Sequence, residues 1–364
     1  MNLLVNRIDN IQIDSKSYDI FSAEATKELN MGGAIVGVNG EYLVDGKNTM
    51  DLVYNSELKF LMGNQMYQAL LRKPMMLFFI PTQEDEFDVN VDELDKRYGI
   101  QSLNLNNFAQ AFSLACWFIK DSCVCTTYSY WLNLLNGYYS QNTRFIDATL
   151  SDGSVSEIYF DDHEVQCAVN MMYTVLGYLL PDESRTGTVQ MTVSGGTKVW
   201  EVDRAMSTAG KSYARALLLL QEARRTGMLS TKIGKYCSLL ECLFAIEGNH
   251  KESIANITAA YIAADDAEKR KIKSDMRIAY GVRSDFSHGG WLSFLKRKQP
   301  EDLAALSQTI DGYVRRVFNK ILTEDELNYD TTRNSKKAVK KYFLRTPLSE
   351  ISSTGEIEQS FRLD

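Results

Sequence analysis

The chain has 364 residues, of which 45% are hydrophobic and 24% are charged, the balance of an ordinary soluble globular protein with length enough for two domains. No apolar run reaches the roughly 18–20 residues that a membrane helix needs, and the N-terminus lacks a signal-peptide pattern, so we expect a cytoplasmic protein without a membrane partner. The net charge is −7, but residues 1–200 hold 13 Lys and Arg against 25 Asp and Glu, whereas residues 201–364 hold 27 against 22. An acidic chain does not by itself indicate nucleic-acid binding, yet a polyanion would be drawn to the C-terminal part.

The first half of the chain predicts a mixed α and β domain over residues 1–195. Turn-forming pairs flanked by β-type residues indicate hairpins, a short apolar run ended by proline indicates a buried strand, and apolar residues at helical spacing indicate helices. In chain order, we expect a hairpin over residues 32–46 with turns at Asn39-Gly40 and Asp45-Gly46, a strand over 75–81, a helix over 105–120, a hairpin over 144–160 around Asp152-Gly153, a helix over 162–178 and a strand pair around Gly195-Gly196.

The second half changes to helical periodicity at Asp203 and keeps it. We expect helices over residues 205–225, 232–247, 252–262, 267–287 and 303–322. Pro300 is the only proline between Asp203 and Arg345, which suits a helical bundle over residues 200–345. The polar, non-periodic residues 346–364 are expected to form a flexible tail. The predicted fold class is therefore α+β, with a mixed N-terminal domain followed by an all-α bundle.

Neither the cysteines nor a glycine-containing segment predicts a cofactor. The six cysteines lack the spacing of a zinc site or of a disulfide framework, so reduced thiols are expected. Residues 205–212 fit the loosest form of a phosphate-binding loop, but Ala205 replaces the first glycine, and no hydrophobic strand ending in aspartate follows. The segment is interpreted more simply as the start of a helix, although a small-molecule enzyme that uses Lys211 stays as the least favoured alternative. We expect no metal and no cofactor.

The three histidines have different settings. His163 follows two aspartates and is expected on the exposed face or cap of a helix, and His250 follows a Gly-Asn pair and is expected in a turn. His288 lies five residues after Arg283 in the stretch RIAYGVRSDFSHGGW, residues 277–291. Five residues turn a helix by about 500°, so the two side chains diverge by about 140° unless the helix ends at His288. The two glycines that follow predict such an ending, which leaves two interpretations: a histidine cap beside a surface arginine, or a reactive pair that faces one groove.

The string AYGVRSDFSHGG at the end of a predicted helix resembles the HEPN superfamily, whose signature is an arginine, four to six residues and a histidine, and it is most similar to the Apea-like HEPN branch. The upstream string SLLECLF, residues 238–244, is similar to a helix of that branch, and the neighbouring helices fall where its other helices would lie. The resemblance covers about residues 200–345, under half of the chain. Ser284 agrees with the Apea-like branch and differs from the Asn, Asp or His often found after the arginine elsewhere in the superfamily.

The resemblance implies a metal-independent endoribonuclease whose active site is shared by two chains of a homodimer. Arg283 and His288 would be catalytic, since a guanidinium fork matches phosphate oxygens and an imidazole moves protons near neutral pH. One histidine supplies one acid–base role, so a second copy of the chain would supply the other. The further site residues are expected to be Tyr280, Ser284 and Asp285, which orient the pair, Glu241, which pairs with an arginine across the bundle or is structural, and Lys296, Arg297 and Lys298, which bind RNA.

The role of the first domain follows only from analogy with proteins of similar architecture. Such regions often sense a trigger or bind a partner, so the chain is expected to be a prokaryotic toxin or a phage-defence effector. The main alternative is a non-catalytic HEPN module that dimerises or binds RNA or a nucleotide, with Arg283 and His288 as structural contacts.

Overall fold

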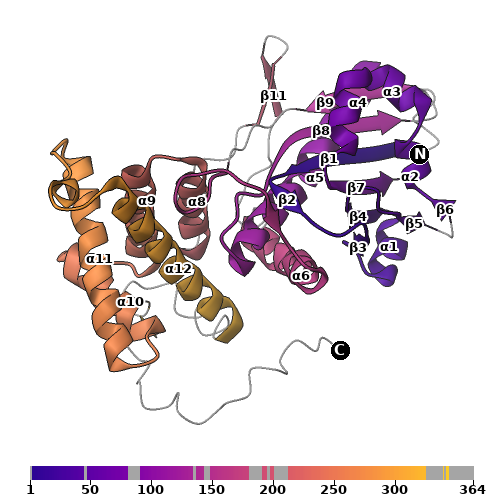
Figure 1. The fold of residues 1–364 in the computed structure, drawn as a ribbon. Coiled ribbons are helices and arrows are strands. Elements are labelled where there is room, and N and C mark those ends of the chain that lie inside the picture. Colours follow the sequence, from indigo (N-terminus) through magenta and orange to yellow (C-terminus); the bar gives the residue numbers. More distant parts are fainter. Residues whose placement is uncertain are drawn as a thin grey trace. The chain divides into compact units, whose positions relative to one another are not determined.

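The computed structural model describes residues 2–44, 47–80, 91–133, 137–142, 148–179, 191–194, 197–200, 212–324, 339 and 342–343. The chain divides into two compact units, the first formed by Met1–Asp182 with Arg224–Gly227 and the second by Glu183–Ala223 with Met228–Asp364. The first unit contains a sheet and helices, and the second is mainly helical (Figure 1). The predicted α+β class with a helical C-terminal region is therefore confirmed.

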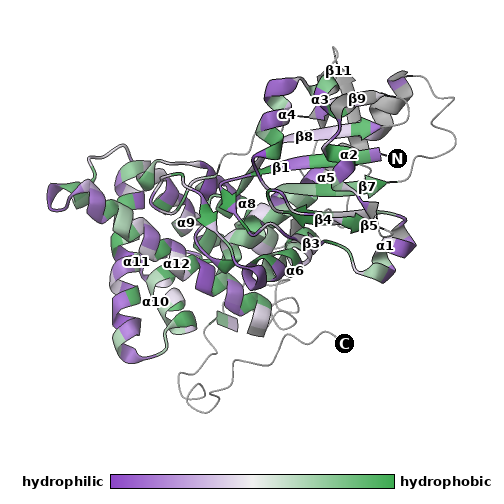
Figure 2. Cartoon of the chain, turned by 45° about the vertical axis from the view of Figure 1, so that its right-hand side comes forward, coloured by the Kyte–Doolittle hydropathy of each residue, from purple (hydrophilic) through white to green (hydrophobic). Residues whose placement is uncertain are grey.

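Within the described part of the first unit, six strands form an antiparallel sheet in the order β3–β4–β7–β1–β8–β9. They are β1 (Asn2–Asp9), β3 (Ser17–Asp19), β4 (Gly32–Val36), β7 (Met75–Ile80), β8 (Cys125–Asn133) and β9 (Tyr138–Asn142). In the central strand β1, Leu4 lies opposite both Phe78 of β7 and Trp131 of β8. Figure 2 shows β7 as a run of hydrophobic residues, the pattern of a strand that is covered on both faces.

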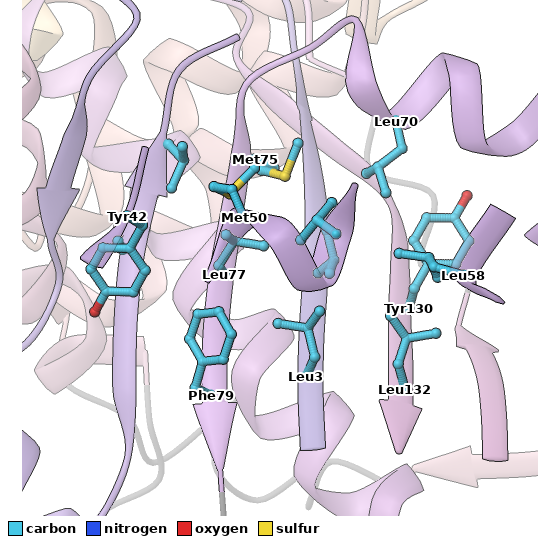
Figure 3. Close-up of a cluster of buried hydrophobic side chains, with 14 of the residues drawn as sticks. Leu3, Tyr42, Met50, Leu58, Leu70, Met75, Leu77, Phe79, Tyr130 and Leu132 are labelled. Carbon is cyan, nitrogen blue, oxygen red and sulfur yellow. The ribbon is translucent and has the colours of Figure 1, made fainter. Parts of the chain in front are cut away.

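One face of the sheet is covered by three short helices. They are α2 (Met50–Val53), α3 (Ser56–Met62) and α4 (Asn64–Leu71), which follow one another along the chain. Leu3, Leu77 and Leu132, each from a different strand, point to this face and pack with Leu58 and Leu70 of these helices (Figure 3). Burial of each such side chain contributes about 1.5–3 kcal/mol, so this cluster is a main source of the unit's stability.

The opposite face of the sheet is covered by the long helix α5 (Val91–Ile119), against which α6 (Asp162–Leu179) packs. The Phe78 ring of β7 lies 5.6 Å from the ring of Phe108, and the Trp131 ring of β8 stacks on Tyr98 at 4.7 Å. Both distances are those of favourable aromatic pairs. The residues that alternate along one strand thus point to helices on the two faces, as strand geometry requires.

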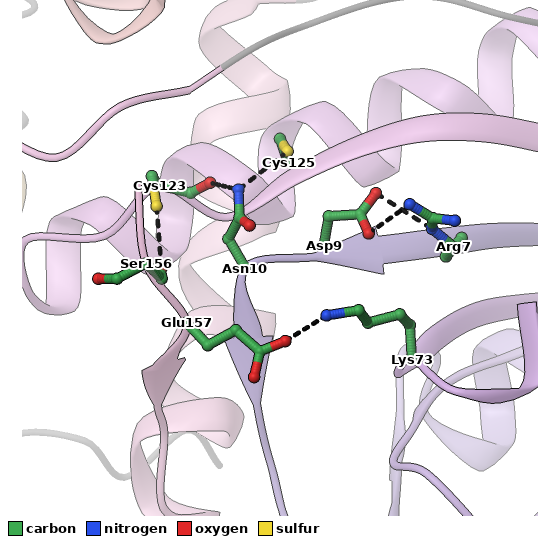
Figure 4. Close-up of polar contacts among 8 residues, drawn as sticks. All are labelled: Arg7, Asp9, Asn10, Lys73, Cys123, Cys125, Ser156 and Glu157. Atoms are coloured by element: carbon green, nitrogen blue, oxygen red, sulfur yellow. Dashed lines mark hydrogen bonds and ion pairs between the residues drawn. The ribbon is translucent and has the colours of Figure 1, made fainter. Parts of the chain in front are cut away.

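Polar side chains fix the segments that follow the end of β1 (Figure 4). Asn10 has a left-handed backbone with φ of 62°, and its amide donates a hydrogen bond to the Cys123 carbonyl at 3.0 Å. Lys73 forms an ion pair with Glu157, immediately before β10 (Ile158–Tyr159). The strand β10 pairs in parallel with β2 (Ile11–Gln12). These contacts attach the chain after residue 148 to the rim of the sheet.

Arg224 is buried within the first unit, with 5% of its surface exposed. Its guanidinium donates to the carbonyls of Ser122 at 3.3 Å and Val124 at 3.4 Å, in the segment between α5 and β8. It also donates to the Ser113 hydroxyl at 3.4 Å. These acceptors are neutral, so this arginine joins main-chain and hydroxyl groups of the first unit.

Several expectations for the first half are confirmed. The strand expected at 75–81 is β7, the helix expected at 162–178 is α6, and the strand pair around Gly195-Gly196 is β11 (Met191–Ser194) with β12 (Thr197–Trp200). The helix expected at 105–120 is present, but α5 begins at Val91. The first domain was expected over residues 1–195, which includes β11, whereas the structure groups both β11 and β12 with the second unit.

Both hairpins expected in the first half are wrong. The strand β4 pairs with β3 and β7, and the hairpin that follows is a short one between β5 (Leu43–Val44) and β6 (Lys47–Asn48). The turn at Asp152-Gly153 exists, since the Gly153 N–H bonds to the Leu150 carbonyl, but β10 then pairs with β2. In both places a turn was correctly recognised, but a strand beside it pairs with a distant segment: β4, before the first turn, pairs with β3 and β7, and β10, after the second, pairs with β2. The helix α1 (Ala23–Leu29) was not expected.

The second unit contains a helical bundle within residues 212–324 (Figure 1). Its helices are α8 (Ser212–Arg225, the last two residues of which group with the first unit), α9 (Leu229–Leu243), α10 (His250–Ile262), α11 (Asp266–Ser287) and α12 (Pro300–Glu324), with the short 3₁₀ helix η2 (Ser293–Lys296) before the last. A buried hydrogen bond of 2.7 Å from the Tyr236 hydroxyl to Asp311 joins α9 to α12. The five helices expected from periodicity are confirmed, with shifted ends.

One shifted boundary matters for the site. The helix α9 ends at Leu243, because Ala245 takes a left-handed conformation with φ of 51°, and α10 already begins at His250. The expectation that His250 lies in a turn is therefore wrong. His163 is exposed at the start of α6, as expected. Lys211, most of the loose phosphate-loop segment and the expected tail at 346–364 lie outside the described residues.

Candidate active site

Arg283 lies near the C-terminal end of α11, at the border of the face that the helix buries. The buried residues of this helix are Ile272, Met276, Ala279 and Val282, at the spacing of one helical face. Arg283 follows the last of them and faces α9, where its Cγ lies 3.6 Å from the position that a Cβ on Gly234 would take. Its side chain is 27% exposed. The side chain is thus anchored in the bundle and stays partly accessible.

Glu241 of α9 and Tyr280 of α11 hold this guanidinium. One terminal nitrogen, Nη2, donates to Oε2 of Glu241 at 3.1 Å, and the other, Nη1, donates to the Tyr280 hydroxyl at 3.1 Å. The guanidinium carbon also lies 5.1 Å from the centre of the Tyr280 ring, within the range of a cation–π contact. The expected pairing of Glu241 with an arginine across the bundle is present, and Arg283 is that arginine.

The groups beside this ion pair keep their protons at neutral pH. Burial raises the pKa of Tyr280 above its usual value, so its hydroxyl stays un-ionised. Burial, reinforced by the negative charge of Glu241, raises the pKa of the Cys237 thiol to about 12. Cys237 is therefore a packed, unreactive thiol and not a nucleophile. All six cysteines, each within the described residues, are free thiols.

A histidine that the sequence did not single out, His250, contacts the same carboxylate. Its Nδ1 lies 3.1 Å from Oε1 of Glu241, the oxygen that Arg283 does not use. The N–H direction is not aligned for a hydrogen bond, yet both atoms are shielded from solvent and neither has another hydrogen-bond partner in the described parts of the chain. The contact is an ion pair when His250 is protonated. Glu241, only 15% exposed, thus lies between an arginine and a histidine.

His288 occupies the C-terminal cap of α11 and its side chain is exposed. The Gly289 N–H bonds to the Phe286 carbonyl at 3.2 Å, and the Gly290 N–H bonds to the Asp285 carbonyl at 2.8 Å. These two bonds, with a φ of 67° at Gly289, form a Schellman motif, so the predicted helix end is confirmed. The imidazole makes no hydrogen bond or ion pair with any residue that the structure describes, which leaves both ring nitrogens accessible.

The remaining predicted residues lie on the turn that follows α11. Asp285 accepts a hydrogen bond from the Ser293 N–H at 2.8 Å and so ties η2 to the helix end. The Ser284 carbonyl accepts the His288 N–H at 3.1 Å, and its side chain is half-buried. Lys296, Arg297 and Lys298 are exposed. Asp285 therefore shapes the turn, and no contact joins it to Arg283 among the described residues.

Two exposed aromatic side chains accompany His288. Phe286 is 41% exposed and Trp291 is 78% exposed, although each is a large apolar residue. They flank the histidine in sequence and precede the basic triplet 296–298. Composition alone could have suggested this combination of aromatic and basic residues, which is typical of surfaces that bind single-stranded nucleic acid.

Two groups of predicted residues thus form around the end of α11. The first joins Arg283, Tyr280 and Glu241 by direct contacts, and His250 belongs to it. The second contains His288 and the exposed turn, and no described contact joins its imidazole to Arg283. His250 was missed because a Gly-Asn pair before it indicated a loop. The available signal was a carboxylate near the end of one helix and a histidine at the start of the next, which a helical hairpin brings together.

Comparisons with protein-family models, with curated proteins and with solved structures gave no significant match. Within the described residues, there is no group of three or more His, Cys, Asp or Glu side chains arranged to hold a metal ion. No helix in the same residues has the length and apolarity to cross a membrane. The function must therefore be argued from the side chains themselves.

Proposed function

We propose that the chain is a metal-independent endoribonuclease of the HEPN type, with Arg283 and His288 as its catalytic residues. The single observation that carries this proposal is the setting of Arg283. Its guanidinium is fixed by Glu241 and Tyr280 at the accessible border of the bundle, one and a half helical turns before an exposed histidine.

These side chains suit transfer of a phosphoryl group to an internal hydroxyl. An arginine presents a planar, permanently charged fork that stabilises the negative charge of a pentacoordinate phosphorane. A histidine takes or gives a proton near neutral pH. The ribose 2′-hydroxyl would attack the adjacent phosphorus, so RNA is the substrate, and DNA, which lacks that hydroxyl, is not cut.

A homodimer with a composite site forms part of this proposal. One His288 serves one acid–base role, and a second copy of the chain brings another. The exposed Phe286 and Trp291 offer faces for unpaired bases, and Lys296, Arg297 and Lys298 offer charges for the phosphates. The first unit would sense a cellular or phage-derived trigger, and the chain would act as a prokaryotic toxin or defence effector in the cytoplasm.

The ion pair of Arg283 with Glu241 also favours a second candidate function. An arginine whose charge is already matched by a carboxylate can be a structural contact. The bundle would then be a non-catalytic HEPN module that dimerises or binds RNA or a nucleotide.

Purified full-length protein incubated with total RNA, with and without EDTA, separates these candidates. We expect cleavage that survives EDTA, leaves 2′,3′-cyclic phosphate ends, and is lost in both Arg283→Ala and His288→Ala. A substrate with a single 2′-deoxynucleotide at the cleavage position should remain intact. Size-exclusion chromatography coupled to light scattering would measure the expected dimer.

Arg277→Ala is the matched control for Arg283→Ala. Arg277 also lies on α11 and also pairs with a glutamate, Glu252 of α10, with contacts of 2.6–3.1 Å, but it is exposed. This variant should cut RNA like the wild type. Binding of RNA without cleavage in every condition would support the non-catalytic module instead, and cleavage abolished by EDTA would contradict a metal-independent mechanism.

A further inference from the structure

His250 is the strongest unassigned feature of the second unit. It is the first residue of α10, and 43% of its side chain is exposed. The exposed part does not include Nδ1, which is shielded against Glu241. The exposed part of the side chain is therefore the part of the ring away from Nδ1.

The shared carboxylate decides how this imidazole is oriented. Nδ1 lies 3.1 Å from Oε1 of Glu241 without an aligned hydrogen bond. A proton on Nδ1 avoids repulsion between the lone pairs of these two atoms, so that tautomer is favoured and Nε2 is left as the proton-accepting nitrogen. When the ring takes a second proton, the same carboxylate offsets the new positive charge. A carboxylate that orients a histidine in this way is the usual companion of a general base.

Glu241 also fixes the position of this base relative to the phosphate-binding group. Its two oxygens are used by different partners, Oε1 by His250 and Oε2 by Arg283. The imidazole and the guanidinium consequently lie on the two sides of one carboxylate. A phosphodiester bound to Arg283 would bring its neighbouring ribose next to His250.

We infer that His250 is a second catalytic residue of the site, the general base that removes the proton from the ribose 2′-hydroxyl, with Glu241 as its positioning residue. This inference rests on the proposed ribonuclease function. It adds a base beside Arg283 to the acid–base groups that the two copies of His288 supply in the proposed composite site. Within one chain, His288 lies five residues beyond Arg283, about 7.5 Å further along the helix axis.

The proposed step balances within these groups. Nε2 of His250 takes the proton from the 2′-hydroxyl, the 2′-oxygen forms its bond to phosphorus, and the bond from phosphorus to the 5′-oxygen breaks. The protonated His288 gives its proton to that leaving oxygen. The products are a 2′,3′-cyclic phosphate end and a 5′-hydroxyl end, and exchange of one proton with water resets each histidine.

The charged and titratable groups around His250 come from three helices. Glu241 lies on α9, Arg283 and Tyr280 lie on α11, and Lys251 and Glu252 lie on α10 itself. Glu252 is already paired with Arg277. Glu241 is therefore the one carboxylate in direct contact with the ring among the described residues.

The test measures single-turnover cleavage of a short RNA between about pH 5 and pH 9. It compares the wild type with His250→Ala, His250→Asn and His288→Ala, and thermal unfolding confirms that each variant folds. Asparagine places an amide near the position of Nδ1, so it keeps a donor for Glu241 but cannot take a proton. His163→Ala, which removes an exposed histidine of α6, is the matched control.

We expect both His250 variants to be slower by about 10²–10³-fold and to lose the acid limb of the pH–rate profile, where the base must be unprotonated. Rates within threefold of the wild type, an intact acid limb, or full rescue by asparagine would each overturn the inference and leave His250 as a contact for Glu241. If the wild type does not cut RNA, the proposed function fails as well. If the wild type and both His250 variants cut RNA and His288→Ala does not, the proposed function stands and only the role of His250 fails.

Discussion

Two arginines, one in each unit, show how differently the same side chain is used. Arg224 is 5% exposed and donates to the Ser122 and Val124 carbonyls and to a serine hydroxyl. The Arg283 side chain is 27% exposed and is held by the Glu241 carboxylate and the Tyr280 hydroxyl. The first is buried and donates to these neutral acceptors, and the second, which is partly exposed, pairs with a charged one.

This difference supports a structural role for Arg224 and the proposed catalytic role for Arg283. Removing Arg224 takes one donor from the buried Ser122 and Val124 carbonyls, and lost hydrogen bonds to buried polar groups are costly. The Arg283 side chain instead stays partly exposed, and its carboxylate partner also contacts His250. The comparison predicts that changes at Arg224 lower the free energy of unfolding, whereas changes at Arg283 lower the rate of RNA cleavage.

The largest effect is expected for Arg283→Lys. Lysine keeps the charge beside Glu241 but loses the planar fork that matches phosphate oxygens, so the cleavage rate should fall by about 10²–10³-fold. Single-turnover kinetics on a short RNA measures this loss. Arg277→Lys on the same helix should leave the rate within about twofold. Equal rates for wild type and Arg283→Lys would mean that a positive charge alone suffices for cleavage. The proposed catalytic use of the Arg283 fork, which distinguishes it from Arg224, would then be wrong.

Arg224→Lys should act on stability instead. A lysine cannot donate to two carbonyls and a hydroxyl in the same geometry, so we expect the free energy of unfolding of the first unit to fall by about 2–3 kcal/mol. Hydrogen exchange of the amides of β1 and β8, measured against urea, reports this quantity. Arg225→Lys, at the exposed neighbouring position, should change it by less than about 0.5 kcal/mol. A cleavage defect in folded Arg224→Lys would contradict the division of roles.

The same comparison explains what the sequence could predict. The end of α11 was predictable because its signal is local: Gly289 has the positive φ that a Schellman motif needs. The apolar stripe of α11, with Val282 beside Arg283, was equally visible as periodicity. The contacts of Arg224 were not predictable, since they join residues about a hundred positions apart.

Long-range pairing also accounts for the failures in the first unit. The turn residues after β4 suggested a hairpin, yet β4 pairs with β7, which comes almost 40 residues later. Turn chemistry indicates where a strand ends and not which strand it joins. His250 was missed for a related reason, since its contact with Glu241 depends on how α9 and α10 are connected after Leu243.

A smaller effect is expected from the basic triplet 296–298, which extends the comparison from one arginine to a surface. Changing Lys296, Arg297 and Lys298 together to Gln should weaken RNA binding and reduce the slope of log affinity against log salt by up to about 2, because each phosphate contact on a single strand contributes about 0.7. The rate at saturating RNA should change far less. The control changes the equally basic residues 269–271 at the start of α11. Equal salt slopes for the two triple variants would show that basic residues on the bundle attract RNA through their charge alone, without a defined binding path.

The smallest effect concerns Glu268, whose ion pair with Arg316 is a surface counterpart of the Glu241–Arg283 pair. The Arg316 guanidinium, followed by the Ala264 N–H, lowers the pKa of Glu268 below its usual value. Its folded-state pKa lies below that of the unfolded chain, so its contribution to stability is present above about pH 4.5 and is lost as the pH falls through the folded-state value. Since the pair is partly exposed, Glu268→Gln should cost less than about 1 kcal/mol at pH 7 and less than that near pH 3. Urea unfolding of the bundle at both pH values measures this difference, and a loss that persists at the lower pH would show that packing, rather than charge, makes Glu268 stabilising.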